Sequence, residues 1–214
     1  LGVRLLCADG QVNDAGQLES IAPAVTEALG RYGLTGVPLP IKSVGVKADL
    51  RSYEHPVLLH DPALAADSSE PNWDRLAEAS GTIHKTVGGI NRTLLNLGDS
   101  LPAAFRPLAA TMTRDRLDLL RECDFLMMDG LRRHGLYGDI WQCPTVLVPL
   151  EIDGQGQELC ILRPIHSERA MTATAARLPR DLLDELKSSI LALPGISGLA
   201  YDLTSKPPGT IEWE

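Results

Sequence analysis

Several short sequence elements recur in the same order in the two halves of the chain. Three pairs carry this pattern: RYGLTG at 31–36 with RHGLYG at 133–138, Leu39-Pro40 with Val148-Pro149, and Gly89-Ile90 with Gly195-Ile196. The members of each pair lie roughly half of the 214 residues apart, which is the signature of a duplicated unit. A duplication constrains the fold strongly, because both halves must then adopt the same small architecture.

Hydrophobic periodicity predicts the elements of each half. Apolar residues three to four apart predict helices over residues 18–32, 73–87, 113–133 and 179–193. Apolar runs predict strands over residues 40–46, 57–59, 91–97, 145–152, 158–163 and 198–203. Each half therefore reads helix–strand–strand–helix–strand. We expect an α/β (α+β) fold of two tandem copies of a small two-layer sandwich, with both helices on one face of the sheet. The predicted domains are residues 1–105 and 106–214, joined near the Pro- and Ala-rich stretch 98–112.

The composition argues against several classes of protein. Lys and Arg number 20 against 28 Asp and Glu, which gives a net charge of −8 with no basic run, so nucleic-acid binding is not expected. No stretch approaches the ~18 apolar residues of a membrane helix, so no membrane partner is expected. The five histidines lack metal-ligand spacing, and we expect no metal site. Four cysteines without a CxxC pair predict free thiols and a cytoplasmic location.

The C-terminal segment YDLTSKPPGTIEWE is the unusual part of the sequence. Pro207-Pro208 predicts a stiff, extended backbone that holds Lys206 and Glu212 in a defined relation. Lys206 is suited to an anion, and Glu212 to accepting hydrogen bonds from a hydroxyl or N–H group. The alternative is a frayed, solvated end, although a terminal Trp213 argues against it.

Residues 202–214 closely resemble the C-terminal signature of the glutamine-hydrolysing GMP synthase family. Residues 194–197 (PGIS), 40–46 (PIKSVGV) and 49–53 (DLRSY) resemble further family segments, so the resemblance covers essentially the whole chain. Because the chain begins with Leu1 rather than Met, we expect it to be part of a longer protein.

The resemblance implies an activity of a larger enzyme. The family adenylates xanthosine 5′-monophosphate (XMP) with Mg-ATP, and ammonia from glutamine then displaces AMP to give GMP. The amidotransferase and ATP pyrophosphatase domains lie upstream of this region, so the resemblance implies no catalytic residue and no cofactor here, with ATP and Mg²⁺ used by the full enzyme. We expect this chain to supply dimerisation surface and part of the XMP pocket, with the upstream ATP pyrophosphatase domain as a partner, and to be inactive alone.

Four residues match family positions at the nucleotide site. By this resemblance Lys206 contacts the phosphate region, Glu212 contacts the bound nucleotide, and Gln142 and Arg51 complete the site. The alternative for Gln142 is a polar residue at a strand edge, and for Arg51 a surface ion pair. Arg163 also matches a family position, where we expect it to shape the strand and loop beside the C-terminal segment rather than contact the ligand.

The matching residues are divided between the halves, since Arg51 lies in the first and the other three in the second. We therefore expect the two halves to form an internal pseudo-dimer, or the chain to self-associate, with Arg51 reaching the C-terminal segment. The tandem arrangement resembles the long form of the family. The alternative function is a stand-alone, non-catalytic module that binds a purine nucleotide or a partner protein.

Overall fold

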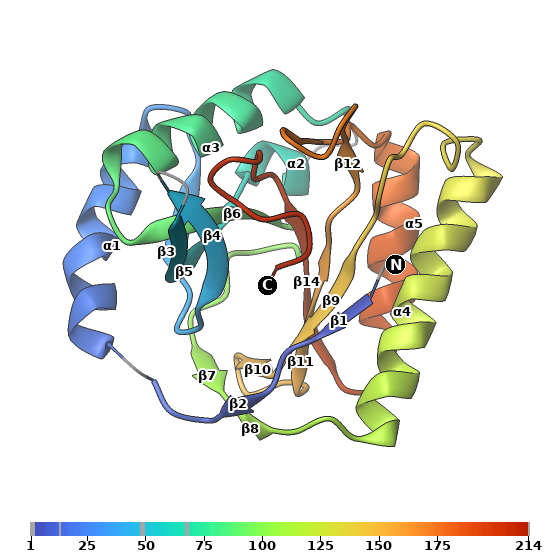
Figure 1. Cartoon of the computed structure of the whole chain (residues 1–214), viewed down its shortest axis with the longest axis horizontal. Helices are drawn as coiled ribbons and strands as arrows, with labels where there is room; N and C mark the ends of the chain where they lie inside the picture. Colours follow the sequence, from blue (N-terminus) through green and yellow to red (C-terminus); the bar gives the residue numbers. More distant parts are fainter. Residues whose placement is uncertain (1–2, 13, 48–49, 67–68, 214) are drawn as a thin grey trace.

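The computed structural model describes residues 3–12, 14–47, 50–66 and 69–213 (Figure 1). Its main feature is one mixed sheet with the strand order β1-β9-β11-β14-β6-β5-β3, in which β4 also pairs with β5. These strands are β1 (Val3–Leu5), β3 (Thr35–Pro38), β4 (Ser43–Lys47), β5 (Leu50–His60), β6 (Ile90–Asn96), β9 (Thr145–Val148), β11 (Glu158–Leu162) and β14 (Ile196–Asp202).

The two halves of the chain meet at the centre of this sheet. There β6 and β14 pair antiparallel, with Tyr201 opposite Leu95. On either side a parallel pair (β5–β6 and β11–β14) is followed by an antiparallel neighbour (β3 and β9). Since one continuous sheet contains both halves, the division into domains 1–105 and 106–214 stays a prediction, as does the duplication itself.

Four long helices cover one face of the sheet: α1 (Ala15–Gly30), α3 (Trp73–Thr86), α4 (Arg114–Arg133) and α5 (Arg180–Leu191). Their apolar stripes join one buried cluster with the sheet, for example Val25, Ile83, Met127 and Leu186. The start of α4 is capped as its sequence suggests, because the Thr113 side chain accepts a hydrogen bond from the Arg116 N–H. The predicted α/β class, with helices on one face, is confirmed. Among the described residues, no helix is long and apolar enough to span a membrane.

The opposite face of the sheet is covered by irregular segments and by residues 203–213, which we call the tail. Trp213 is 1% exposed and packs in a second cluster with Leu58, Leu94 and Ala200. Short strands complete this layer: β2 (Ala8–Asp9) pairs with β8 (Ala109–Ala110), β7 (Phe105–Pro107) pairs with β10 (Leu150–Ile152), and β12 (Ile165–His166) pairs with β13 (Thr174–Ala175). The tail is therefore packed against the sheet, not frayed.

Several predicted elements differ from the structure. The predicted strand 145–152 is divided into β9 and β10 at Pro149, which cannot donate to a ladder. The connection that contains residues 154–156 joins an antiparallel pair, β9 and β11, whereas β10 turns away from β11 and pairs with β7. Neither strand β3 nor the short helix α2 (Pro62–Ala66) was predicted.

Candidate functional site

The tail lies between a segment of the first half and a segment of the second. On one side the Val46 N–H of β4 donates to the Pro208 carbonyl over 2.7 Å, and Gly45 bridges Gly209. On the other side Lys206 and Ala173 exchange backbone hydrogen bonds of 2.8 and 3.2 Å. Both halves therefore hold the segment that carries two of the predicted site residues.

The backbone of the tail turns at the two prolines. The Gly209 N–H donates to the Ser205 carbonyl over 3.1 Å, and the Ser205 hydroxyl donates to the Pro207 carbonyl over 2.8 Å. The expectation of an extended run through Pro207-Pro208 is therefore wrong, because local hydrogen bonds close a turn there. The turn still holds Lys206 in a defined place, since its backbone pairs with Ala173.

A buried carboxylate, Asp202 at the end of β14, organises the start and the end of the tail. Its Oδ1 accepts a hydrogen bond from the Thr204 N–H at 2.9 Å and forms an ion pair with Arg163 Nη1 at 3.0 Å. Its Oδ2 accepts from Arg92 Nη1 at 2.9 Å and from Trp213 Nε1 at 2.8 Å. Burial alone raises the pKa of Asp202, but the guanidinium groups of Arg163 and Arg92 and the hydrogen bonds from Thr204 outweigh it and leave the pKa lowered.

The two arginines extend this network to the tail backbone, and both side chains are 0% exposed. Arg92 Nη2 donates to the Thr210 carbonyl at 3.1 Å and to its hydroxyl at 2.7 Å, and the guanidinium lies 4.5 Å from the centre of the Trp213 ring. Arg163 donates to the carbonyls of Ile211 and Thr204. Arg163 thus has the shaping contacts that we expected, whereas Arg92 and Asp202 were not predicted. Their signal in the sequence is a charged residue in a predicted strand, Arg92 in residues 91–97 and Asp202 in residues 198–203.

The predicted site residues on the tail lie at the protein surface. Lys206 is partly buried, and its Nζ donates to the Ala170 carbonyl over 2.6 Å. The Glu212 carboxylate is 45% exposed and forms an ion pair with Arg4 of β1. Arg4 was not predicted as part of this region, because its partner lies at the other end of the chain.

Arg51 and Gln142 are each separated from the tail by one intervening segment. Arg51 of β5 is exposed and stands opposite Val46, the residue that hydrogen-bonds Pro208, so one strand separates it from the tail. Its side chain has no hydrogen bond or ion pair among the described residues, and the expected alternative of a surface ion pair is therefore not seen there. Gln142 pairs through its backbone with Ile165 and lines a cavity of about 480 Å³ beside α4. The segment 165–175 separates Gln142 from the tail.

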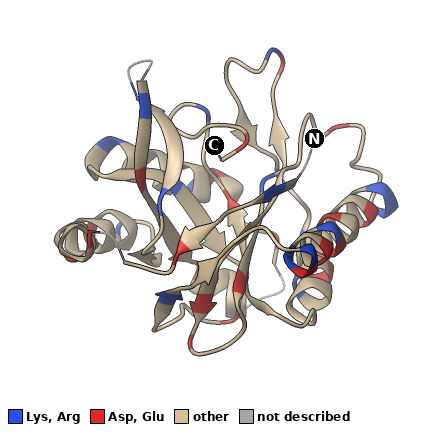
Figure 2. Ribbon diagram, turned by 60° about the horizontal axis from the view of Figure 1, so that its bottom comes forward, with Lys and Arg blue, Asp and Glu red and all other residues tan. Residues whose placement is uncertain are grey.

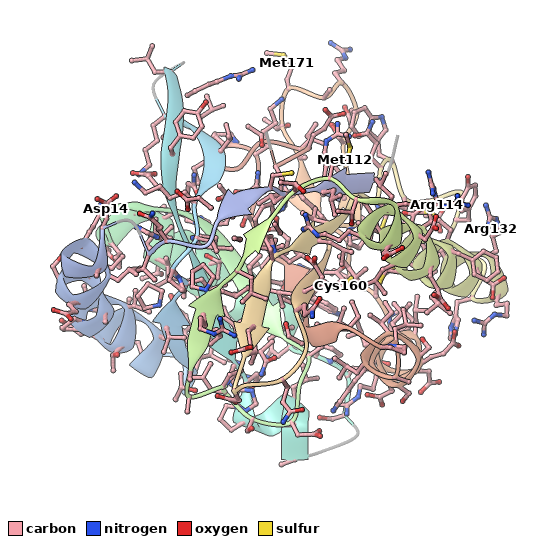
Figure 3. The ribbon with its side chains drawn as sticks, turned by 90° about the horizontal axis from the view of Figure 1, so that it is seen from below. Asp14, Met112, Arg114, Arg132, Cys160 and Met171 are labelled. Atoms are coloured by element: carbon pink, nitrogen blue, oxygen red, sulfur yellow. The ribbon has the colours of Figure 1, made fainter. Side chains whose placement is uncertain are left out.

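Two projections flank the tail on the face opposite the helices. Figure 3 shows the β4–β5 hairpin and the segment that carries Met171 rising from the same side of the molecule. Met171 is 77% exposed and Tyr53 of the hairpin is 60% exposed. Figure 2 shows basic and acidic residues intermixed along the helices on the right of the picture. The structure thus places Lys206 and Glu212 on the tail, Arg51 one strand away from it, and Gln142 beyond the segment 165–175.

The cysteines form no hydrogen bond to the tail among the described residues. Cys123, Cys143 and Cys160 are buried free thiols, and Cys7 is an exposed one. Burial raises the pKa of the Cys143 thiol well above its usual value. Within the described ranges, no group of three His, Cys, Asp or Glu residues is arranged to hold a metal ion.

Comparisons with known proteins point to one family. Residues 129–213 match the family model described as GMP synthase C terminal domain. The whole chain aligns with a probable glutamine-hydrolysing GMP synthase from Leptospira interrogans at 39% identity, and the alignment covers 34% of that protein. The GMP synthase of Gloeobacter violaceus aligns with 48% of the chain at 44% identity, over 20% of its own length. The GMP synthase of Leifsonia xyli aligns with 50% of the chain at 43% identity, over 23% of its own length. The chain therefore spans about a third, or less, of the length of these relatives.

Proposed function

We propose that the chain is the C-terminal region of a glutamine-hydrolysing GMP synthase and forms part of the XMP pocket of an enzyme that makes GMP. In this enzyme ATP activates XMP, and ammonia derived from glutamine replaces the activated oxygen. ATP and Mg²⁺ are cofactors of the whole enzyme, and the amidotransferase and ATP pyrophosphatase domains lie outside this chain. The identity over the complete chain is the observation that carries the proposal.

The tail supports this role through the chemistry that it displays. Lys206 has three N–H donors, of which one is used by Ala170, so its ammonium group retains donors for a phosphate. A carboxylate accepts several hydrogen bonds, so Glu212 can bind Arg4 and a nucleotide N–H or hydroxyl together. The exposed guanidinium of Arg51 is suited to bidentate contact with a phosphate. Gln142, at the margin, takes part through its amide group if the bound nucleotide extends toward α4.

The meeting of the two halves supports an internal pseudo-dimer. The first half supplies β4, which hydrogen-bonds the tail of the second half, and Arg92, which ties β6 to the same tail. A site with Arg51 from one half and Lys206 from the other therefore needs no second chain. Self-association of the protein, and docking of the ATP pyrophosphatase domain beside the tail, belong to the same proposal.

Steady-state kinetics of the full-length enzyme test the proposal. Lys206→Ala and Arg51→Ala remove charged hydrogen bonds, which contribute about 1.5–3 kcal/mol each, so we expect the KM for XMP to rise roughly 10- to 150-fold. Matched controls are Lys85→Ala, at an exposed position of α3, and Arg114→Ala, whose side chain is 91% exposed on α4 (Figure 3). Unchanged KM values in both site variants would refute the assignment. A full-length protein that binds XMP without turnover would instead favour the non-catalytic alternative.

A further inference from the structure

Arg4 of β1 lies on the same face of the sheet as the tail. Strand β1 is an edge strand that pairs parallel with β9, with Arg4 opposite Val146 and Leu5 opposite Leu147. Leu5 and Leu147 pack in the cluster that joins the helices to the sheet, whereas Val146 packs in the cluster on the tail side. Since side chains alternate along a strand, Arg4 points to the face that the tail covers.

The backbone on either side of Glu212 is held by buried contacts. The Ile211 carbonyl accepts a hydrogen bond from Arg163 Nε over 3.1 Å. The ring of Trp213, which is 1% exposed, donates to Asp202 over 2.8 Å. These contacts place the Glu212 backbone but not its side chain, which is 45% exposed. An exposed glutamate side chain samples many rotamers, so another group must hold the carboxylate in one place.

Arg4 supplies that contact to the Glu212 carboxylate. Its Nη2 donates a hydrogen bond to Oε2 of Glu212, and the Arg4 side chain is itself only 22% exposed. The other carboxylate oxygen, Oε1, accepts no hydrogen bond among the described residues. Because a carboxylate accepts several hydrogen bonds, Oε1 can accept one from a nucleotide N–H or hydroxyl while Oε2 stays on Arg4.

We propose that Arg4 is a positioning residue for nucleotide binding, which holds the Glu212 carboxylate so that Oε1 is presented to XMP. The inference rests on the proposed function, since it requires Glu212 at the XMP site. Arg4 acts through Glu212 and does not touch the ligand in this role. Holding a binding group in its bound conformation raises affinity because less ordering is left for the binding step.

Steady-state kinetics of the full-length enzyme test this role with Arg4→Met, which keeps an apolar stem and removes the guanidinium. We expect the KM for XMP to rise about three- to tenfold, as for the loss of one ordered side chain. Because the lost interaction serves binding, kcat and the KM for glutamine should be unchanged. Arg4→Lys keeps a cation that can pair with Glu212 and should recover most of the affinity. If Arg4→Met does not fold, Arg4→Gln repeats the test, since its shorter, neutral side chain does not extend as far as Nη2.

The double variant Arg4→Met/Glu212→Ala distinguishes a positioning role from a structural one. If Arg4 acts through Glu212, the double variant should have the same KM for XMP as Glu212→Ala alone, because the two changes remove one coupled interaction. Fold-changes that multiply in the double variant would overturn the proposal. A rise in KM for Glu212→Ala with none for Arg4→Met would also overturn it and would leave the proposed function standing. Unchanged KM values in Lys206→Ala and Arg51→Ala are the separate result that refutes the proposed function.

Arg106→Met is the matched control for the loss of an arginine from an ion pair. Arg106 of β7 pairs with Glu151 of β10, and neither residue belongs to the tail. The KM for XMP should therefore stay at the wild-type value in this variant. A rise as large as that of Arg4→Met would contradict the assignment to Arg4.

Discussion

The replacement Asp202→Asn tests whether one buried carboxylate holds the tail. Asp202 neutralises two guanidinium groups that are 0% exposed, so loss of its charge leaves Arg92 and Arg163 buried without a counter-ion. Breaking a buried pair in this way costs about 3–5 kcal/mol. For a chain of this length that loss lowers Tm by roughly 6–20 °C. Urea unfolding followed by circular dichroism measures the loss as a shift in the midpoint at constant slope.

The pH dependence of the same variant supplies an independent check. The pKa of Asp202 is lowered in the folded state, so its carboxylate stabilises the fold fully above the unfolded-state pKa of about 4. This contribution is lost as the pH falls through the folded-state pKa. The difference in unfolding free energy between wild type and Asp202→Asn should therefore be constant near neutral pH and shrink in strong acid.

Asp118→Asn is the matched control, because the Asp118 side chain is 53% exposed and pairs only at the surface of α4. A surface pair contributes less than about 1 kcal/mol, so this variant should unfold almost as wild type does. If Asp202→Asn cost no more than Asp118→Asn, the account of a buried charge network anchoring the tail would be refuted.

Three further predictions concern other described residues. Burial lowers the pKa of His84 to about 4. The folded protein therefore favours the neutral ring, and its unfolding free energy falls as the pH drops from about 6.5 toward 4. In His84→Gln, the unfolding free energy measured with urea should depend less on pH over that range. A Cβ at Gly45 would lie 2.8 Å from the Pro208 carbonyl oxygen and from the Asn91 side chain, so Gly45→Ala should lower the unfolding free energy by about 1–3 kcal/mol. Gly16 on α1 faces open space, so Gly16→Ala should not destabilise the fold. Equal urea midpoints for the two variants would contradict the crowding at Gly45. Cys7 is exposed and the other three thiols are buried, so one thiol should react quickly with Ellman's reagent in the native protein and all four only after unfolding. A second fast-reacting thiol would contradict the burial of the other three cysteines.

Local sequence patterns predicted the helices better than the strand pairing. Thr113 and the apolar stripe after it defined α4 within a residue of its observed start, because caps and a 3.6-residue period act over a few neighbouring residues. Strand pairing was less accessible. Strand β10, for example, pairs with β7, more than forty residues earlier, through a contact that no local period encodes.

The candidate site was predicted in part, and its supporting residues were not. Lys206 and Glu212 were selected from the tail motif, and Arg51 and Gln142 by resemblance, and their roles toward XMP stay predictions. Asp202 and Arg92 were missed, because they pair with each other and lie 110 positions apart in the sequence. A charged residue in a predicted strand indicates a buried partner but does not identify it.

The amino-acid sequence by itself determined the α/β class, the positions of the long helices and the correspondence of the tail to one enzyme family. These features depend on periodicity, capping and short contiguous motifs, which are written in neighbouring residues. Only the tertiary structure decided that β6 and β14 pair at the centre of the sheet, that both halves hydrogen-bond the tail, and that Nε2 of His55 has no hydrogen-bond partner among the described residues. Each of these features requires groups from distant segments to meet, and that outcome follows from how the whole chain buries its apolar faces while satisfying its buried polar groups.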